Sequence, residues 1–289
     1  MIINDLRGWG MNPMLKENDD EILSNIIIPP RPSILLKFQQ AQEQDADLAY
    51  IAELIAQDMG LSAAVLKTIN SAYYGLSEKV TSLKVAVSLL GMKQISMLVT
   101  GLSLRKIGGS LDFDMFWKHS VETAASSALI AQQLGNINVD DAQLFGLFHD
   151  CGKILLSQQF AEYENTLKIA SGFDQSFSAF ERHRHGTDHT LVGSLLSSAW
   201  CLPTSISLAI RYHHDISAFH DRVLSDQVLS LIALHNLSEY LTNHNNEYAY
   251  CEWSNHADEM MYWLQITDND VADFQSQVNN LKSELGSSN

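Results

Sequence analysis

Apolar residues recur at spacings of three and four along most of this chain, which is the period of an amphipathic helix. Capping residues and glycines interrupt that pattern at short intervals. No stretch alternates apolar and polar residues over the length of a strand. The pattern therefore predicts an all-α fold built from many short helices.

The first part of the chain is predicted to fold as a series of helices that starts at Ser33. The segment 26–32 before it holds three prolines, which fix their own φ and keep the preceding residues out of the helical region, so we expect extended chain there. Further helices are expected at Leu48–Gln57, Ala63–Ala72, Leu83–Leu90 and Met92–Lys106. The expected caps are Asp45 or Asp47, Ser62 and Ser82, and the expected ends are Gly60, Gly75 and Gly91.

Two adjacent glycines, Gly108 and Gly109, mark the expected joint between two helical parts, because they stop a helix and leave a flexible connection. Residues 1–25 show no sustained period and are interpreted as a lead-in segment. Residues 26–108 are predicted to form an N-terminal helical subdomain. Residues 109–289 are predicted to form a second helical subdomain with a C-terminal helical extension.

The second part opens with a long helix that Asp112 or Asp114 can cap and Gly135 can end. Its middle, Thr123–Ala128, has only small side chains, which lets other helices approach closely. The next helix is expected to start at Asp140 and Asp141 and to carry His149 and Asp150 within its apolar run. The remaining expected helices are Phe160–Ala170, Asp188–Trp200 capped by Thr187, Thr204–His214, Leu224–Leu241 and one or two within Glu252–Leu285, with a polar stretch at Phe180–His185.

Composition excludes some classes of function. The 289 residues are 46% hydrophobic, which is enough for a globular core. The 34 acidic residues outnumber the 18 basic ones and give a net charge of −16, which repels phosphate backbones and anionic lipids. We therefore expect no direct contact with nucleic acid and no membrane binding.

Cysteine usage and the apolar runs indicate a cytoplasmic protein. Cys151, Cys201 and Cys251 are too widely spaced to suggest a disulfide framework or a thiolate zinc site, which fits a reducing compartment. The best apolar run, Ile95–Leu104, is about half as long as a membrane span requires.

Candidate chemistry is concentrated after residue 118, because all eleven histidines lie there. His149 and Asp150 are polar neighbours in an apolar run, and burying them is costly unless they are hydrogen-bonded or bind a metal. Helices can bring such side chains to one interior point. The candidate ligands are His119, His149, Asp150, His189, His213 and His214, a nitrogen and oxygen set that suits Fe, Mn, Ni or Zn.

Lys153 follows His149 by one helical turn, so its ammonium can reach the same side and serve an anionic substrate such as a phosphoester. A second catalytic scheme uses Cys151 as a nucleophile with His149 or His119 as its base, and needs an exposed thiolate. The alternative is that Cys151 is a small apolar residue that lines its helix.

Several motifs resemble known families. The segment Phe148–Lys153 resembles the HD-x-G-K motif of the HD superfamily, with His119 at the position of its upstream metal histidine. Other motifs resemble the HDOD family, the HD-related output domain of bacterial signalling proteins, over about residues 26–240. They are Ile28–Pro32, Ile55–Asp58, Asn70–Ala72, Val80–Leu83, Gly186–His189, Trp200–Pro203 and Tyr212–His214.

The resemblance implies an all-α fold in which an N-terminal helical part packs on an HD-like part. It also implies a role in bacterial signal transduction with protein partners. Catalytic HD proteins end their ligand set with a later Asp, where this chain offers His235 or Asn236. Asn is a weaker ligand, so His235 is the candidate substitute. The related HD-GYP phosphodiesterases carry a Gly-Tyr-Pro segment that does not follow His214 here, which argues against hydrolysis of cyclic di-GMP.

Two hypotheses follow. The first is a cytoplasmic bacterial regulatory protein whose HD-derived pocket holds a divalent metal, a small anion or a nucleotide without turnover. The second is a metal-dependent phosphohydrolase that acts on phosphomonoesters, nucleotides or cyclic nucleotides and in which Lys153 stabilises charge on the phosphoryl oxygens.

Overall fold

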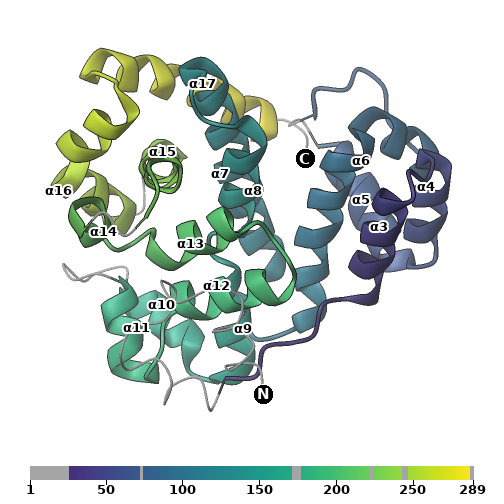
Figure 1. Ribbon diagram of the computed structural model, residues 1–289, viewed down its shortest axis with the longest axis horizontal. Helices are drawn as coiled ribbons and strands as arrows, with labels where there is room; N and C mark the ends of the chain where they lie inside the picture. Colours follow the sequence, from purple (N-terminus) through teal and green to yellow (C-terminus); the bar gives the residue numbers. More distant parts are fainter. Residues whose placement is uncertain (1–25, 72–73, 171–176, 222–223, 243–246, 287–289) are drawn as a thin grey trace. The chain divides into compact units, whose positions relative to one another are not determined.

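The computed structural model describes residues 26–71, 74–170, 177–221, 224–242 and 247–286, and these form helices joined by turns, with no strand among them (Figure 1). This confirms the all-α prediction. The predicted lead-in segment, residues 1–25, lies outside the described residues.

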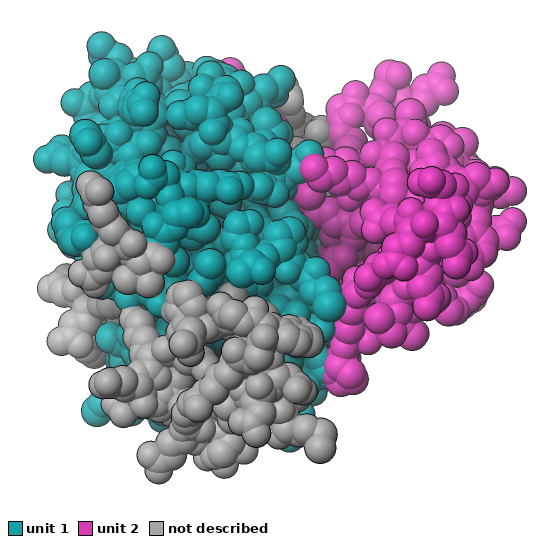
Figure 2. Space-filling view, in the orientation of Figure 1, with its two compact units in different colours: residues 1–29, 108–278 teal, residues 30–107, 279–289 magenta. Residues whose placement is uncertain are grey.

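The chain divides into two compact units (Figure 2). Unit 1 comprises Gly108–Val278 and the segment that ends at Pro29, and unit 2 comprises Pro30–Ile107 and Asn279–Asn289. All candidate site residues, from His119 to His235, belong to unit 1.

Unit 2 contains a small aliphatic core, to which Ile51, Val65 and Ile95 contribute fully buried side chains. Its helices are α3 (Ser33–Glu43), α4 (Leu48–Ala56), α5 (Met59–Ile69), α6 (Leu83–Ser103) and the 3-10 helix η3 (Leu104–Ile107).

The expected caps of unit 2 hold the N-cap position in two of three places, and one of these two makes a side-chain cap hydrogen bond. Asp47 caps α4, where its side chain accepts a hydrogen bond from Tyr50 N. Asp58 rather than Ser62 caps α5, which therefore begins four residues earlier than Ala63 and contains Gly60 in its first turn. Ser82 precedes α6 but makes no side-chain cap hydrogen bond. Asp58 is a stronger acceptor than Ser62, because its carboxylate is charged and the start of a helix is the positive end of its dipole.

Helix α6 is divided at Gly91, which has φ 71° and ψ 173° and separates the two helical segments as the sequence predicts. Leu83–Ile107 is long and apolar enough to cross a membrane by length and composition alone, although 44% of its most apolar window is buried inside the protein. Neither segment beside Gly91 has the roughly 20 continuous helical residues that a span needs.

Unit 1 is a larger assembly in which α7 packs on α8 and α15, α12 packs on α9 and α13, and α15 packs on α16 (Figure 1). Its helices are α7 (Phe113–Leu134), α8 (Val139–Phe148), α9 (Cys151–Gln159), α10 (Tyr163–Ala170), α11 (Phe177–His185), α12 (His189–Ala199), α13 (Thr204–Tyr212), α14 (Ser217–Asp221), α15 (Asp226–Thr242) and α16 (Glu247–Leu264). The last helix, α17 (Asp268–Gly286), belongs to unit 1 as far as Val278 and to unit 2 from Asn279.

Close packing of α7 against α8 follows from small residues on both helices. A Cβ atom built on Gly146 would lie 2.8 Å from the Cα of Ala124. This confirms the prediction that the Thr123–Ala128 stretch admits a neighbouring helix. The predicted ends of α7 are also confirmed, because Asp112 caps its start and Gly135 ends it in the left-handed conformation.

Asp140 and Asp141 lie in the first turn of α8, as the sequence predicts, and Asn138 caps that helix. Two other expectations for unit 1 are wrong. Asp188 rather than Thr187 caps α12 by accepting from Leu191 N. The stretch predicted to be simply polar, Phe180–His185, belongs to helix α11. Helix α11 was missed because its four final residues are all basic, which hides the short apolar face at its start.

Candidate metal centre

His149 and Asp150 lie at a break between two helices rather than inside one. Helix α8 ends at Phe148 and α9 begins at Cys151, so the pair forms the corner between them. The backbone stays bonded through the corner, since His149 N donates to Phe145 O (2.8 Å) and Lys153 N donates to Asp150 O (2.9 Å). Both side chains are buried. The corner directs two polar side chains into the same interior space.

Gly152 brings this corner close to α12. A Cβ atom on Gly152 would lie 2.0 Å from the carbonyl oxygen of His189 and 2.7 Å from Gly193 N. Only glycine fits such an approach. Gly152 therefore lies in the first turn of α9 and permits the contact of α9 with α12.

A pocket of about 60 Å³ lies at this corner. Helices α7, α9, α11, α15 and α16 and the residues after α13 contribute to it. Its lining residues are His119, His149, Asp150, Lys153, Phe177, His214, His235, Asn236, Glu239 and Glu252.

The first candidate cluster consists of His119, His149 and Asp150. The two Nε2 atoms are 3.4 Å apart. Asp150 Oδ2 lies 3.2 Å from His149 Nε2 and 3.8 Å from His119 Nε2. Three potential ligand atoms thus surround one small space.

The second candidate cluster consists of His189, His213 and His214. The Nε2 atoms of His189 and His213 are 3.4 Å apart. Asp150 connects the clusters, because its Oδ1 lies 3.5 Å from His189 Nε2 while its Oδ2 faces the first cluster. The structure therefore brings together all six ligands that the sequence suggests.

The outer nitrogen of four imidazoles is held by an acceptor. His149 Nδ1 bonds Gly146 O (2.8 Å) and His213 Nδ1 bonds Ile210 O (2.8 Å). His189 Nδ1 bonds a Glu181 carboxylate oxygen (2.5 Å), and His214 Nδ1 bonds Glu252 (2.9 Å). A proton held on Nδ1 leaves Nε2 as the lone-pair atom, which is how metal-binding histidines are normally oriented.

Charges in the pocket favour an anionic Asp150. Burial raises the pKa of Asp150, but His149 and Lys153 outweigh it and hold the pKa well below its ordinary value. Burial lowers the pKa of His149, yet Asp150 outweighs that effect and the net shift is upward. The Lys153 ammonium lies 2.5 Å from Asp150 Oδ2, so it neutralises part of the carboxylate's charge.

Two other histidines are kept neutral. Burial first, and then the neighbouring imidazoles, lower the pKa of His213 well below 6.5. Burial and His149 do the same to the pKa of His235. Neutral imidazole is the form that binds metals.

These residues fit a divalent metal. Asp150 Oδ1 is buried and has no hydrogen-bond partner among the described residues, and the same is true of His235 Nδ1. Such atoms are costly to bury unless something satisfies them. A cation would satisfy the carboxylate oxygen, and the nitrogen and oxygen donors around it suit Fe, Mn, Ni or Zn.

The predicted substitute His235 also reaches the first cluster. Its ring centroid lies 4.4 Å from that of His149, and His149, His235 and Glu239 offer ligand atoms within 4.8 Å of one another. Its neighbour Asn236 lines the pocket as well, and its amide donates to His213 O (3.3 Å) and Ile232 O (3.0 Å).

The Cys151 nucleophile is contradicted by the structure. The thiol is fully buried and its Sγ lies 3.6 Å from Gly193 O. Burial first, and then Asp150, raise the pKa of the Cys151 thiol far above its ordinary range. A buried thiol that keeps its proton cannot act as a nucleophile. Cys151 is instead a small apolar residue that lines its helix, as the alternative interpretation predicts.

Three acidic residues near the histidines were missed from the sequence: Glu181, Glu239 and Glu252. Glu181 is fully buried on α11, where the Tyr163 hydroxyl also donates to it. Burial raises the pKa of Glu239, but His119 and His149 outweigh it and lower the pKa to about 2. Only Glu239 carried a local signal, because it follows His235 by four residues and so lies on the same helix face.

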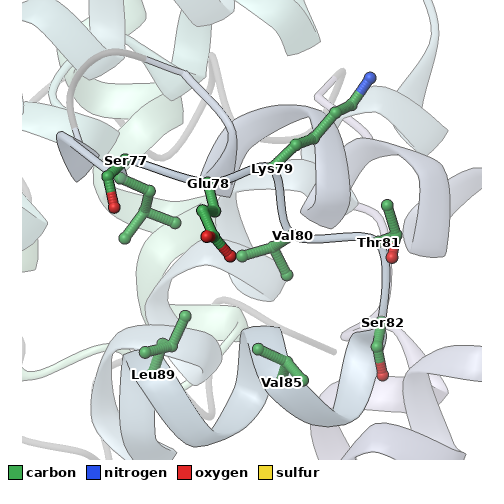
Figure 3. Close-up of a pocket in the computed structure, with 9 residues that line it drawn as sticks. Ser77, Glu78, Lys79, Val80, Thr81, Ser82, Val85 and Leu89 are labelled. Atoms are coloured by element: carbon green, nitrogen blue, oxygen red, sulfur yellow. The ribbon is translucent and has the colours of Figure 1, made fainter.

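A larger hollow in unit 2, of about 340 Å³, lies between residues 76–82 and α6 (Figure 3). Val85 and Leu89 project from the helix toward the segment, whereas Lys79 points away from it (Figure 3). Its lining residues include none of the candidate ligands. It offers no metal chemistry.

Comparisons with known proteins agree with this architecture. An uncharacterized protein from Treponema pallidum is 26% identical over 194 residues, a match that covers 65% of this chain and 38% of that protein. The chain therefore spans well under half the length of that relative.

Solved structures share the fold. An HDOD domain protein of unknown function from Geobacter sulfurreducens has a TM-score of 0.62 at 24% identity and covers 91% of this chain and 96% of its own. A "Putative phosphohydrolase" from Shewanella amazonensis has a TM-score of 0.69 at 19% identity, and the match covers 95% of this chain and 99% of that one. A "Putative signal transduction protein" from Marinobacter aquaeolei has a TM-score of 0.65 at 19% identity, and the match covers 94% of this chain and 60% of that one.

The family model of the HDOD domain matches residues 28–216, which include both clusters but end before α15 and α16. His235, Glu239 and Glu252 thus reach the pocket from helices beyond the matched region. Because the match extends over more than half of its length, this chain belongs to the HDOD domain family.

Proposed function

We propose that this chain is a cytoplasmic regulatory protein of a bacterial signalling pathway, in which metal occupancy of the His/Asp pocket sets a conformation that a protein partner recognises. The observation that carries the proposal is the orientation of the imidazoles. Four of them have Nδ1 held by an acceptor, and the Nε2 atoms of His119, His149, His189 and His213 lie within 3.4 Å of a second one. Such preorganisation suits a bound cation.

The size of the pocket favours regulation over turnover. At about 60 Å³ it has room for an ion and roughly four waters, or for one small anion. Pockets that enclose organic ligands are about 300–1,000 Å³. A nucleotide would have to lie largely outside it. The expected ligands are therefore a divalent metal and a small anion.

The net charge of −16 supports a protein partner over nucleic acid or an anionic membrane. A partner with a basic surface would be attracted at long range, and salt would weaken that attraction.

A second candidate function, metal-dependent phosphoester hydrolysis, is favoured by Lys153. Its ammonium lines the pocket and also lies 5.2 Å from the centre of the Phe177 ring. A divalent cation held by His119, His149 and Asp150 would supply Lewis acidity and a coordinated water of lowered pKa. Lys153 would then orient an anionic group and stabilise charge on its oxygens.

One experiment separates the two functions. The metal content of the purified, metal-supplemented protein is measured together with hydrolysis of bis(p-nitrophenyl) phosphate and of linear and cyclic nucleotides. The regulatory proposal expects bound metal without turnover, and loss of the metal in a His149→Ala/Asp150→Ala double variant that keeps its helicity. Turnover that the double variant abolishes would instead establish the phosphohydrolase. A protein that takes up no metal would refute both.

A further inference from the structure

Glu239 faces the first cluster from α15, one helical turn after His235. Where catalytic HD proteins carry their later aspartate, this chain offers His235 or Asn236, and neither side chain is a carboxylate. The amide nitrogen of Asn236 is engaged by His213 O and Ile232 O. The cluster would thus lack its later carboxylate unless another residue supplies one.

The distances around Glu239 match those of a fourth ligand. Its Oε1 lies 3.3 Å from His119 Nε2 and 3.7 Å from His149 Nε2. The four potential donor atoms are the Nε2 atoms of His119 and His149, Asp150 Oδ2 and Glu239 Oε1. Five of the six distances between them are 3.2–3.8 Å. Four ligands at about 2.0–2.1 Å from one ion in tetrahedral geometry are about 3.4 Å apart.

The surrounding helices hold Glu239 in this place. The fully buried Thr123 of α7 donates its hydroxyl to Glu239 Oε1 (2.7 Å). One turn further along α7, Ser127 donates to Ser238 (3.0 Å). The small residues of α7 therefore both admit α15 and fix its carboxylate, as an outer-shell partner fixes a metal ligand.

We propose that Glu239 is the fourth metal ligand of the first cluster and closes it as a four-coordinate site. This inference rests on the proposed function, since it presumes that the pocket binds a metal. Two imidazoles and two carboxylates balance the charge of a divalent cation. A tetrahedral site with four protein ligands is the structural kind, because catalytic sites keep one position for water or substrate. The ion of this cluster therefore organises the helices and performs no hydrolysis.

Cobalt binding to the full-length protein tests this assignment. Metal-free protein is titrated with Co²⁺, whose visible absorption is intense in four-coordinate sites and weak in six-coordinate ones. The wild type should develop the intense bands. Glu239→Gln, which keeps the shape but removes the charge, should lose them and bind Co²⁺ at least about 100-fold more weakly, the upper end of the cost of an outer-shell change.

Glu122→Gln is the matched control, because it is the same substitution on the neighbouring helix α7. Glu122 does not line the pocket and instead pairs with Lys118 (3.8 Å). It should titrate like the wild type. Thr123→Val removes the hydroxyl that positions Glu239 and should weaken Co²⁺ binding less than Glu239→Gln does. If Glu239→Gln fails to fold, Glu239→Asp replaces it, and its shorter carboxylate should also lose intensity and affinity.

Wild-type affinity and unchanged bands in Glu239→Gln, or in Glu239→Asp where that variant replaces it, would overturn the assignment of Glu239 and leave the metal-binding proposal intact. A wild type that binds no Co²⁺ would overturn the proposed function, and this inference with it.

Discussion

Asn236 is a structural residue at a position where a ligand was expected. Its side-chain amide donates to His213 O (3.3 Å) and Ile232 O (3.0 Å), so its nitrogen ties α15 to the end of α13. A carboxylate cannot donate to these carbonyls. The residue that looks like a weakened metal ligand in the sequence thus has a role that aspartate could not fill.

Asn236→Asp should therefore destabilise the protein instead of restoring a ligand. Losing both donations and placing a negative charge against two carbonyl oxygens should cost about 1–3 kcal/mol, the usual penalty of an unsatisfied buried group. Urea unfolding would measure the change, and the same substitution at the exposed Asn280 is the control. Wild-type stability with tighter metal binding would show that Asn236 is only a weak ligand.

Asp58 combines two roles that mutation can separate. It caps α5 by accepting from Leu61 N (3.0 Å), and its other oxygen lies 2.5 Å from Lys106 Nζ. Asp58→Asn keeps a cap and should cost less than about 1 kcal/mol, because the ion pair is largely exposed. Asp58→Ala loses both interactions and should cost about 0.5–2 kcal/mol in urea unfolding. Equal costs for the two variants would contradict this division.

The stabilisation that Asp58 provides should depend on pH. The hydrogen bonds from Lys106 and then from Leu61 N lower the pKa of Asp58. A carboxyl whose folded pKa is below its unfolded value of about 3.9 stabilises the protein above that value, and the effect is lost as the pH falls through the folded pKa. The difference in stability between wild type and Asp58→Asn should therefore shrink below about pH 4.

At the scale of elements, the contact of α9 with α12 sets the spacing between the two clusters. His149 and Asp150 precede α9, His189 begins α12, and Gly152 allows the backbones to approach. A methyl group added at Gly152 would lie 2.0 Å from His189 O. Because this oxygen belongs to the backbone, relieving the clash would require one of the two helices to move.

Gly152→Ala should therefore separate the helices, cost about 1–3 kcal/mol as overpacking does, and weaken metal binding. Gly60→Ala in α5 is the matched control, because its added Cβ would only reach ordinary contact at 3.4 Å from Asp58 Oδ1. That variant should be neutral or more stable by up to about 1 kcal/mol. Denaturant unfolding and metal titration would compare them. An unchanged metal affinity in a folded Gly152→Ala protein would refute the link between this helix contact and the site.

Local patterns predicted the elements well because caps and glycines act over a few residues. Asp47, Asp112, Gly91 and Gly135 all hold the expected positions. At two helix starts the cap is an aspartate where a hydroxyl residue was expected: Asp58 instead of Ser62, and Asp188 instead of Thr187.

The site was predictable only where residues lie within a motif. His149, Asp150 and His189 could be named in advance, although their spacing could not. The carboxylates that complete the site, Glu181 and Glu252, lie on helices whose approach to His189 and His214 depends on tertiary packing. No sequence period reports which distant acidic side chain meets which histidine.

For the whole molecule, the distribution of ligands matters more than their number. Every candidate ligand, from His119 to Glu239, belongs to unit 1, whereas the helices of unit 2 from α3 to η3 contribute none. A metal that binds only the folded form of one unit stabilises that unit by mass action.

Removing the metal should therefore destabilise unit 1 selectively. With free metal at about 100 times its dissociation constant the stabilisation is about 2.7 kcal/mol, which slows by roughly 100-fold the exchange of amides that require unit 1 to unfold. Hydrogen exchange with and without a chelator would measure this, comparing α8, α9 and α12 with α4 and α5. A His149→Ala/Asp150→Ala double variant should show no effect of the chelator. Equal loss of protection in both units would mean that the ion's influence is not confined to the unit that holds it, and unchanged protection in α8, α9 and α12 would mean that the pocket is not a metal centre.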